Sequence, residues 1–261
     1  MGYDCRGNLK RARMSFEQAV IFAGGRGERL RPLTDTVPKP MAPVHGRPFA
    51  DYLLTMLAEA GIKRVLFLLG YKAQRVIDHY ENQQIPGLNI DYSVGHEEDQ
   101  TGRRLINAYE KLEDKFLLLY GDNYWPVPLE QMKKNYAHLP AVLTTTVFSN
   151  KNGTGEYGFG NNVIVDPKGM VKAYDKSRKL SGLNGVDIGF FLVDKKVIDP
   201  NESGNISFEE VVLARNAAQG RLGAFVTDEQ YYYITSYESL KHFEQVVSQK
   251  AIVAFQEKGH G

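Results

Sequence analysis

A segment near the start of the chain combines glycines with cationic side chains, directly after an apolar run. Its glycines are Gly24, Gly25 and Gly27, and its cationic residues are Arg26, Arg29, Arg31 and Lys39. Glycines let the backbone come close to an anion and turn N–H groups toward it, while guanidinium and ammonium groups supply the opposite charge. We therefore expect residues 23–44 to hold a nucleoside triphosphate, because a basic surface turn has no need of Pro38-Lys39-Pro40 beyond the glycines.

Two better-known phosphate-binding loops do not fit this segment. A P-loop needs Gly-Lys followed by Ser or Thr where its helix begins, and no glycine of residues 23–44 precedes a lysine. A dinucleotide fingerprint needs a small residue where Leu30 stands. The triphosphate must therefore be held in another way.

A carboxylate follows a second apolar run. Gly121 and Asp122 come directly after residues 116–120, so Asp122 emerges where a buried strand is expected to end. Mg²⁺ prefers oxygen ligands and often takes one or two carboxylates together with substrate phosphates. We expect Asp122 to bind Mg²⁺ rather than to serve only in a turn. Asn123 could bond a ligand or simply shape the turn.

The first segment also carries a family resemblance. Two stretches resemble the signature of the sugar-1-phosphate nucleotidyltransferases: Gly24-Gly25-x-Gly27-x-Arg29-Leu30-x-Pro32-Leu33-Thr34 and Pro38-Lys39-Pro40-Met41. The wording of residues 38–49, with Gly61-Ile62 and Gly70-Tyr71-Lys72, is most similar to the branch that includes mannose- and heptose-1-phosphate guanylyltransferases. The resemblance extends from about Phe16 to Leu240.

The resemblance implies transfer of a nucleotidyl group from a nucleoside triphosphate, with GTP as the expected donor, to a mannose- or heptose-like 1-phosphate. Pyrophosphate is released and a nucleotide sugar forms, as in the supply of polysaccharide precursors. A sugar phosphate is already an anionic nucleophile, so alignment and charge neutralisation suffice and no general base is needed. Two alternatives stay open: another base or a non-sugar phosphate acceptor, and a catalytically weak regulatory homologue that binds nucleotide sugars.

Matching the family motif residue by residue assigns three sets of side chains. The expected catalytic set, in which Arg29 contacts the pyrophosphate and Lys176 the sugar phosphate, is Arg29, Lys39, Asp122 and Lys176. The expected nucleotide-binding set is Ala23, Gly24, Gly25, Arg26, Gly27, Thr101, Gly102 and Asn123. The expected sugar-binding set is Gly158, Asp175 and Asp187, where Asp187 stands for the family's asparagine unless Asn184 is its counterpart.

The loop that reads the base in this family departs from its usual Leu-Gly-Thr-Gly-Gly. Residues 99–103 read Asp-Gln-Thr-Gly-Arg, so that either the loop has shifted or Arg103 contacts phosphate. The customary Glu just upstream is Gly95, with Glu97 and Glu98 as candidates to replace it.

The second metal carboxylate of the family is also missing. Tyr233 stands where the family has an aspartate. Asp228 or Glu229 could substitute if the strand shifts, Asp187 is an alternative from another strand, or Asp122 could suffice because the triphosphate itself coordinates Mg²⁺.

Apolar runs and helical periods alternate through the first half of the chain. Strand-like runs are 19–23, 64–69, 90–94 and 116–120, and helix-like segments are 49–60, 73–80, 104–112 and 129–139. This alternation predicts an α/β fold with a mostly parallel, Rossmann-like sheet flanked by helices. Ligands of such sheets collect beyond the carboxyl ends of the strands, so the glycine loop and Asp122 should meet there.

The second half predicts a smaller β-rich elaboration that binds the sugar. A strand is expected over 141–148, a hairpin within 157–174 that turns at 166–169, and a helix from a capping box at Ser207 to about Gln219. A last helix is expected over about 238–256, with an apolar stripe of Leu240, Phe243, Val246, Val247 and Ala251.

Composition bounds the remaining possibilities. The 261 residues, 43% of them apolar, suit a single domain over 14–261, with a nucleotide half at about 16–140 and a sugar half at about 141–240. A net charge of +1 favours neither nucleic acid nor an anionic membrane. The single Cys5 allows no internal disulfide, which fits the cytoplasm, and residues 1–13 are expected to form a disordered basic extension. A homo-oligomer is compatible with the sequence.

Overall fold

The computed structural model describes residues 15–153 and 157–258, with side chains described up to residue 249. The expected basic extension over 1–13 and Cys5 lie outside this part of the chain.

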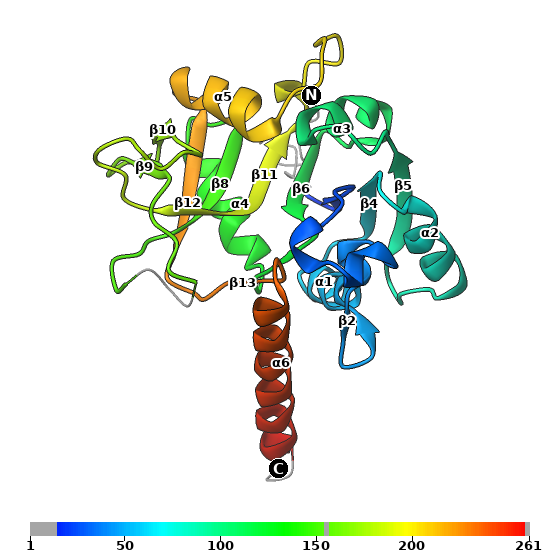
Figure 1. Ribbon diagram of the computed structural model, residues 1–261. Helices are drawn as coiled ribbons and strands as arrows, with labels where there is room; N and C mark the ends of the chain where they lie inside the picture. Colours follow the sequence, from blue (N-terminus) through cyan, green and yellow to red (C-terminus); the bar gives the residue numbers. More distant parts are fainter. Residues whose placement is uncertain (1–14, 154–156, 259–261) are drawn as a thin grey trace, which may run out of the picture.

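A seven-stranded mixed sheet forms the centre of the molecule, in the order β12-β8-β11-β6-β1-β4-β5 (Figure 1). Its strands are β1 (Gln18–Ala23), β4 (Arg64–Leu69), β5 (Asn89–Val94), β6 (Lys115–Tyr120), β8 (Leu143–Phe148), β11 (Val186–Asp194) and β12 (Leu222–Thr227). The β1–β4, β1–β6, β4–β5 and β12–β8 pairs are parallel, and β11 runs antiparallel to both β6 and β8. The expected mostly parallel sheet is confirmed, and it includes strands from both halves of the chain.

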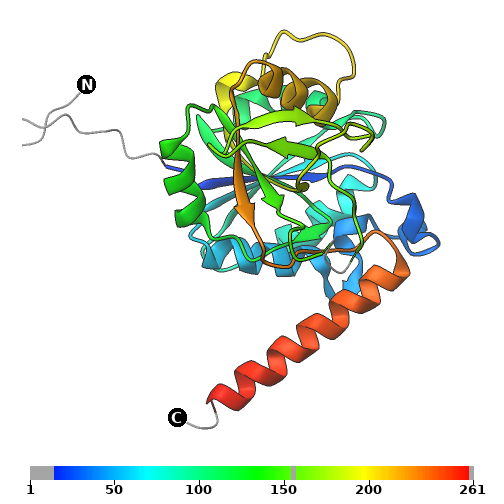
Figure 2. The ribbon, with the colours of Figure 1, turned by 90° about the vertical axis from the view of Figure 1, so that its left-hand side faces the viewer.

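Helices cover both faces of this sheet (Figures 1 and 2). The α-helices are α1 (Phe49–Glu59), α2 (Ala73–Asn82), α3 (Thr101–Asn107), α4 (Leu129–His138), α5 (Ala214–Ala218) and α6 (Tyr237–Lys258). Buried residues of α1, α2 and α4 pack in one hydrophobic cluster with the start of α6. Those of α3 and α5 pack in a second cluster. Central strands buried on both faces need near-continuous apolar runs, and β1 is buried at all six positions.

Shorter elements complete the fold. The 3-10 helices are η1 (Glu28–Leu30), η2 (Leu33–Asp35), η3 (Lys39–Met41), η4 (Tyr109–Lys111) and η5 (Lys195–Val197), and η6 (Phe208–Leu213) is a π-helix. The small antiparallel pairs are β2 (Pro43–Val44) with β3 (Arg47–Pro48), β7 (Asn123–Tyr124) with β13 (Tyr232–Tyr233), and β9 (Val163–Val165) with β10 (Val171–Tyr174). The expected hairpin is therefore confirmed over 163–174.

Two helix boundaries are informative. Ser207 caps η6 as expected, because its hydroxyl accepts from the Glu210 backbone N–H at 3.2 Å. The helix expected over 104–112 instead begins at Thr101 and ends at Asn107, where η4 follows after one residue. This earlier start decides which way the side chains of the helix point.

Helix α6 extends away from the body of the molecule (Figures 1 and 2). Its first turns are anchored by Leu240 and Phe243, which are buried in the hydrophobic cluster that also holds residues of α1, α2 and α4. The expected last helix is thus confirmed, although Ala251 lies beyond the described side chains. Within the described residues, no helix combines the length and apolar character needed to cross a bilayer.

Candidate active site

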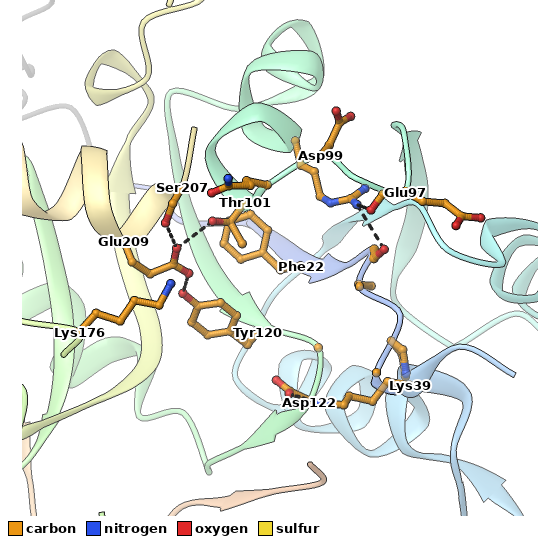
Figure 3. A pocket seen from close by; sticks show the side chains of 18 residues that line it. Phe22, Lys39, Glu97, Asp99, Thr101, Tyr120, Asp122, Lys176, Ser207 and Glu209 are labelled. Atoms are coloured by element: carbon orange, nitrogen blue, oxygen red, sulfur yellow. Dashed lines mark hydrogen bonds and ion pairs between the residues drawn. The ribbon is translucent and has the colours of Figure 1, made fainter. Parts of the chain in front are cut away.

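A cavity of about 370 Å³ lies beyond the carboxyl ends of β1 and β6 (Figure 3). These strands are parallel neighbours, and the Gly121 N–H donates to the Phe22 carbonyl at 2.9 Å. The sites predicted from sequence that line the cavity are Ala23, Gly24, Gly25, Gly27, Lys39, Thr101, Asp122 and Lys176. The structure therefore brings the glycine loop, the metal-binding candidate and the sugar-phosphate lysine together at one sheet edge.

Lys39 and Asp122 form an ion pair in this cavity. The Nζ atom lies 2.7 Å from Oδ2, and the two side chains are 14% and 24% exposed. Lys39 begins η3 in the loop after β1, whereas Asp122 leaves the end of β6. A positive and a negative group thus neutralise each other where a nucleotide and its metal are expected to bind.

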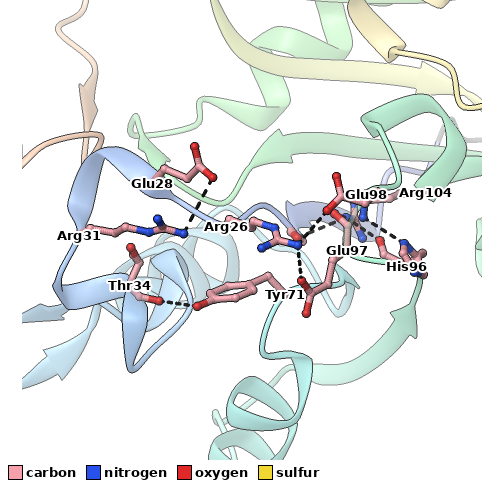
Figure 4. Close-up of polar contacts among 10 residues, drawn as sticks. Arg26, Glu28, Arg31, Thr34, Tyr71, His96, Glu97, Glu98 and Arg104 are labelled. Carbon is pink, nitrogen blue, oxygen red and sulfur yellow. Dashed lines mark hydrogen bonds and ion pairs between the residues drawn. The ribbon is translucent and has the colours of Figure 1, made fainter.

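A second hollow adjoins the cavity and shares Lys39 with it. Arg29 lines this hollow together with Lys39 and Glu28. Arg26 also lines it, but its guanidinium binds Glu97 at 3.0 Å and Glu98 at 2.8 Å (Figure 4). Both glutamates neutralise Arg26 in this structure, and Glu97 also lines the cavity, so their part as replacements for the carboxylate missing at Gly95 stays a prediction.

The loop at 99–103 is anchored to a distant part of the chain. Arg103 donates to the carbonyl of Glu202 at 2.7 Å and to that of Gly204, so its guanidinium does not reach the phosphate region. At Gly102 a Cβ would lie 2.8 Å from the Ile206 carbonyl oxygen, so that only glycine allows this close approach. The departure from the family loop is explained by an anchor onto residues 202–206.

Thr101 belongs to a buried hydrogen-bond network around Glu209. The Glu209 carboxylate is 7% exposed and accepts from Thr101 at 2.8 Å, from Ser207 at 2.6 Å and from the Tyr120 hydroxyl (Figure 3). Burial opposes ionisation of Glu209, but the hydrogen bonds from Ser207 and Tyr120 outweigh it and lower its pKa. The carboxylate thus ties the wall of the cavity on β6 to the loop at 99–103.

Sequence reasoning assigned no role to several residues that line the cavity: Asp99, Gln100, Arg104, Tyr120, Ser207 and Glu209. The only sequence signal near Glu209 was the capping box formed by Ser207 and Glu210. It predicted where the helix begins, but not that the Glu209 side chain points into the cavity wall.

Other candidates have side chains occupied elsewhere. Asn123 donates to the Ile188 carbonyl at 2.9 Å, which supports the turn-shaping alternative. Asp175 accepts from the Ser177 hydroxyl and from the backbone N–H groups of residues 177, 179 and 180, and these bonds lower its pKa to about 2. Gly158, Asp175 and Asp187 do not line the cavity, so their assignment to the sugar stays a prediction.

The alternatives for a second metal carboxylate are also placed. Tyr233 packs its ring against Tyr157 and Phe159, with ring centroids 3.9 and 5.2 Å away. Asp228 pairs with Lys151 and Ser149 outside the cavity. In the part of the chain that the structure describes, no group of three or more His, Cys, Asp or Glu side chains could hold a metal.

Asp187 gives a prediction about stability and pH. Burial raises the pKa of this carboxyl to about 6, against hydrogen bonds from Thr145, Gly189 and Tyr174 that favour its charged form. Between about pH 4 and pH 6 the unfolded chain releases the proton while the folded chain keeps it, so folding becomes less favourable as the pH rises. Asp187→Asn removes this titration. Relative to the wild type, its free energy of unfolding should rise by about 2 to 3 kcal/mol from pH 4 to pH 7.

Urea unfolding at pH 4, 5, 6 and 7 measures this difference. Asp175→Asn is the matched control, because a carboxyl with a lowered pKa is already ionised in both states across most of this range. A constant difference between wild type and Asp187→Asn would show that Asp187 has an ordinary pKa.

Comparison with known proteins places this geometry in context. The family model described as nucleotidyl transferase matches residues 18–206. A D-glycero-alpha-D-manno-heptose 1-phosphate guanylyltransferase of Campylobacter jejuni is 29% identical over 229 residues, covering 87% of this chain and 98% of that protein. A probable glucose-1-phosphate cytidylyltransferase of Bacillus subtilis is 25% identical over 88% of this chain and 94% of that protein. The crystal structure of HddC from Yersinia pseudotuberculosis complexed with GMP-PN superposes with a TM-score of 0.70 at 25% identity, over 87% of this chain and 97% of that one.

Proposed function

This chain belongs to the nucleotidyl transferase family, and from that premise we propose that it transfers a guanylyl group from GTP to a mannose- or heptose-like sugar 1-phosphate. The products are pyrophosphate and a nucleotide sugar. The supporting observation is the cavity at the ends of β1 and β6, where Lys39, Asp122 and Lys176 converge beside the glycine loop.

The transfer needs one bond to form and one to break. An oxygen of the sugar phosphate attacks the α-phosphorus of the triphosphate, and the bond from that phosphorus to the β-phosphate bridging oxygen breaks in line. Pyrophosphate leaves with the bonding electron pair, and no proton has to move because the nucleophile is already an anion. The protein is asked to align two anions and to neutralise their charge.

Cationic residues on two sides of the cavity meet this need. Lys39 and Arg29 face the region proposed for the outer phosphates and for the departing pyrophosphate. Lys176 lines the opposite wall, where its Nζ lies 3.5 Å from the exposed Glu210 carboxylate. A weak exposed pair of this kind leaves the lysine available to bind a sugar phosphate instead.

The residues present also fit a magnesium ion that arrives with the triphosphate. Asp122 offers a carboxylate whose Oδ1 accepts no hydrogen bond from any described residue, and one carboxylate plus phosphate oxygens is a common Mg²⁺ coordination. We propose that Asp122 holds the ion, which would stabilise the charge that develops on the phosphates. With the ion held there, Lys39 would take a phosphate oxygen as its partner in place of Asp122.

The proposal is tested by measuring pyrophosphate release from each of the four nucleoside triphosphates with Mg²⁺ and a panel of sugar 1-phosphates. Release is expected with GTP and a mannose or heptose 1-phosphate, and not without an acceptor. Release with CTP or UTP but not with GTP would identify another donor. Tight binding of a nucleotide sugar with no release across the panel would support a regulatory homologue instead.

A further inference from the structure

We propose that Arg104 and Asp99 together read the nucleobase and select guanine. The inference rests on the proposed donor, GTP, and names the side chains that would choose it. The two residues lie on the cavity wall formed by the loop after β5 and the start of α3.

Arg104 carries a positive charge into this wall, close to the Asp99 carboxylate but with no ion pair to it among the described residues. Its side chain is 5% exposed, and its guanidinium donates only to main-chain carbonyls, those of Gly24, Leu69, His96 and Glu97, at 2.7 to 3.2 Å (Figure 4). Among the described residues no carboxylate lies within ion-pair distance of it. Its Nε–H has no acceptor in that part of the chain, and Nη1 donates only to Leu69. A buried cation with spare donors suits an acceptor on a ligand.

The glycines around Arg104 make room for this side chain. At Gly24 a Cβ would lie 2.3 Å from the guanidinium carbon, and at Gly70 it would lie 2.5 Å from Nη1. The guanidinium therefore fills the space between the ends of β1 and β4, next to the loop whose backbone is expected to hold the nucleotide. Its neighbour Arg103 points instead toward residues 202–204.

Asp99 supplies the matching acceptor. Its Oδ2 accepts from the His96 N–H at 2.8 Å and from Asn107 Nδ2 at 3.0 Å, whereas Oδ1 has no donor among the described residues. A Cβ atom added to Gly95 would lie 2.6 Å from Asp99 Oδ2 and 3.6 Å from Arg104 Nη1. Both side chains thus adjoin Gly95, the residue where the family's glutamate is missing.

This pair complements guanine better than the other common bases. Guanine presents a carbonyl acceptor beside an imino N–H and an amino group, which match one guanidinium donor and one carboxylate acceptor. Adenine presents an amino donor and a ring-nitrogen acceptor in these places, so it would face like groups. Uracil matches the carbonyl and the imino group but has no amino group for the carboxylate.

The experiment measures the affinities of GTP, ITP, ATP and UTP for the full chain by calorimetry, in the wild type, Arg104→Gln and Asp99→Asn. The base of ITP is guanine without its amino group. The wild type should bind GTP about 10-fold or more tightly than ATP and UTP. Arg104→Gln should reduce the GTP-to-ATP ratio by about 10-fold, and Asp99→Asn should abolish the preference for GTP over ITP.

The ratios of nucleotide affinities separate base recognition from a structural role, because a loosened loop would weaken the binding of all four nucleotides alike. Arg103→Gln is the matched control, and it should leave every ratio unchanged. If Arg104→Gln does not fold, Asp99→Asn still decides, since asparagine can keep the bond from the His96 N–H. Unchanged ratios in a folded variant, or a wild type that prefers ATP or UTP, overturn the inference. Selective GTP binding without pyrophosphate release supports it and refutes the transfer reaction alone.

Discussion

Asp122→Asn is expected to lower kcat/KM for pyrophosphate release by about 10³-fold. The side chain keeps its size and can still accept a hydrogen bond from Lys39, which lies 2.7 Å from Oδ2. What it loses is the negative charge that we propose to hold Mg²⁺. Release should therefore be measured against Mg²⁺ concentration, where the variant should need more metal to reach half of its reduced maximum.

A control for charge alone is Asp91→Asn, since Asp91 lies on β5 outside the cavity and pairs with Lys111 at 2.9 Å. It should leave kcat/KM within about 3-fold of the wild type, because exposed ion pairs contribute little. If Asp122→Asn behaved like this control, Asp122 would not be the metal ligand.

Lys39→Ala should reduce kcat by about 10²- to 10³-fold, the usual effect of removing one charged group that stabilises a developing negative charge. The KM for the triphosphate should change much less if Lys39 acts chiefly in the transition state. The alanine variant also leaves Asp122 without its cation in the free protein, so the incoming phosphates meet an uncompensated carboxylate. Steady-state rates at varied triphosphate concentration separate kcat from KM.

The double variant Lys39→Ala with Asp122→Asn sharpens this test. Because the two side chains are in contact, their effects on the activation free energy should not add, and the double variant should be less impaired than the product of the single losses. Lys63→Ala, outside the cavity, is the matched lysine control. Additive losses would mean that the ion pair has no part in the reaction.

The convergence of Lys39 and Asp122 was predictable from sequence. Both follow apolar runs that were expected to be strands of one mostly parallel sheet, and the carboxyl ends of parallel strands share one edge. Residues 83 positions apart could therefore be placed in one site before any coordinates were known.

Arg103 and Arg104 show where such prediction fails. They are adjacent and of one type, and their roles differ only through the phase of α3, which the sequence placed three residues too late. With the helix starting at Thr101, Arg104 turns into the cavity and Arg103 turns toward residues 202–204. Short helices carry too few apolar positions to fix that phase.

Glu209 was unpredictable for another reason. Its partners Thr101 and Tyr120 lie about a hundred positions earlier in the chain, and local patterns carry no information on such contacts. A capping box indicates only that a helix begins.

The contacts of the loop at 99–103 bear on how such proteins can be recombined. Its fixed points are Glu209, which binds Thr101 across 108 positions, and the carbonyls of Glu202 and Gly204, which bind Arg103. A chimera joined near residue 140, with its first half from one relative and its second half from another, would separate the loop from these partners. Nucleotide binding is therefore not a modular trait of the first half, and such a chimera should bind all nucleotides more weakly.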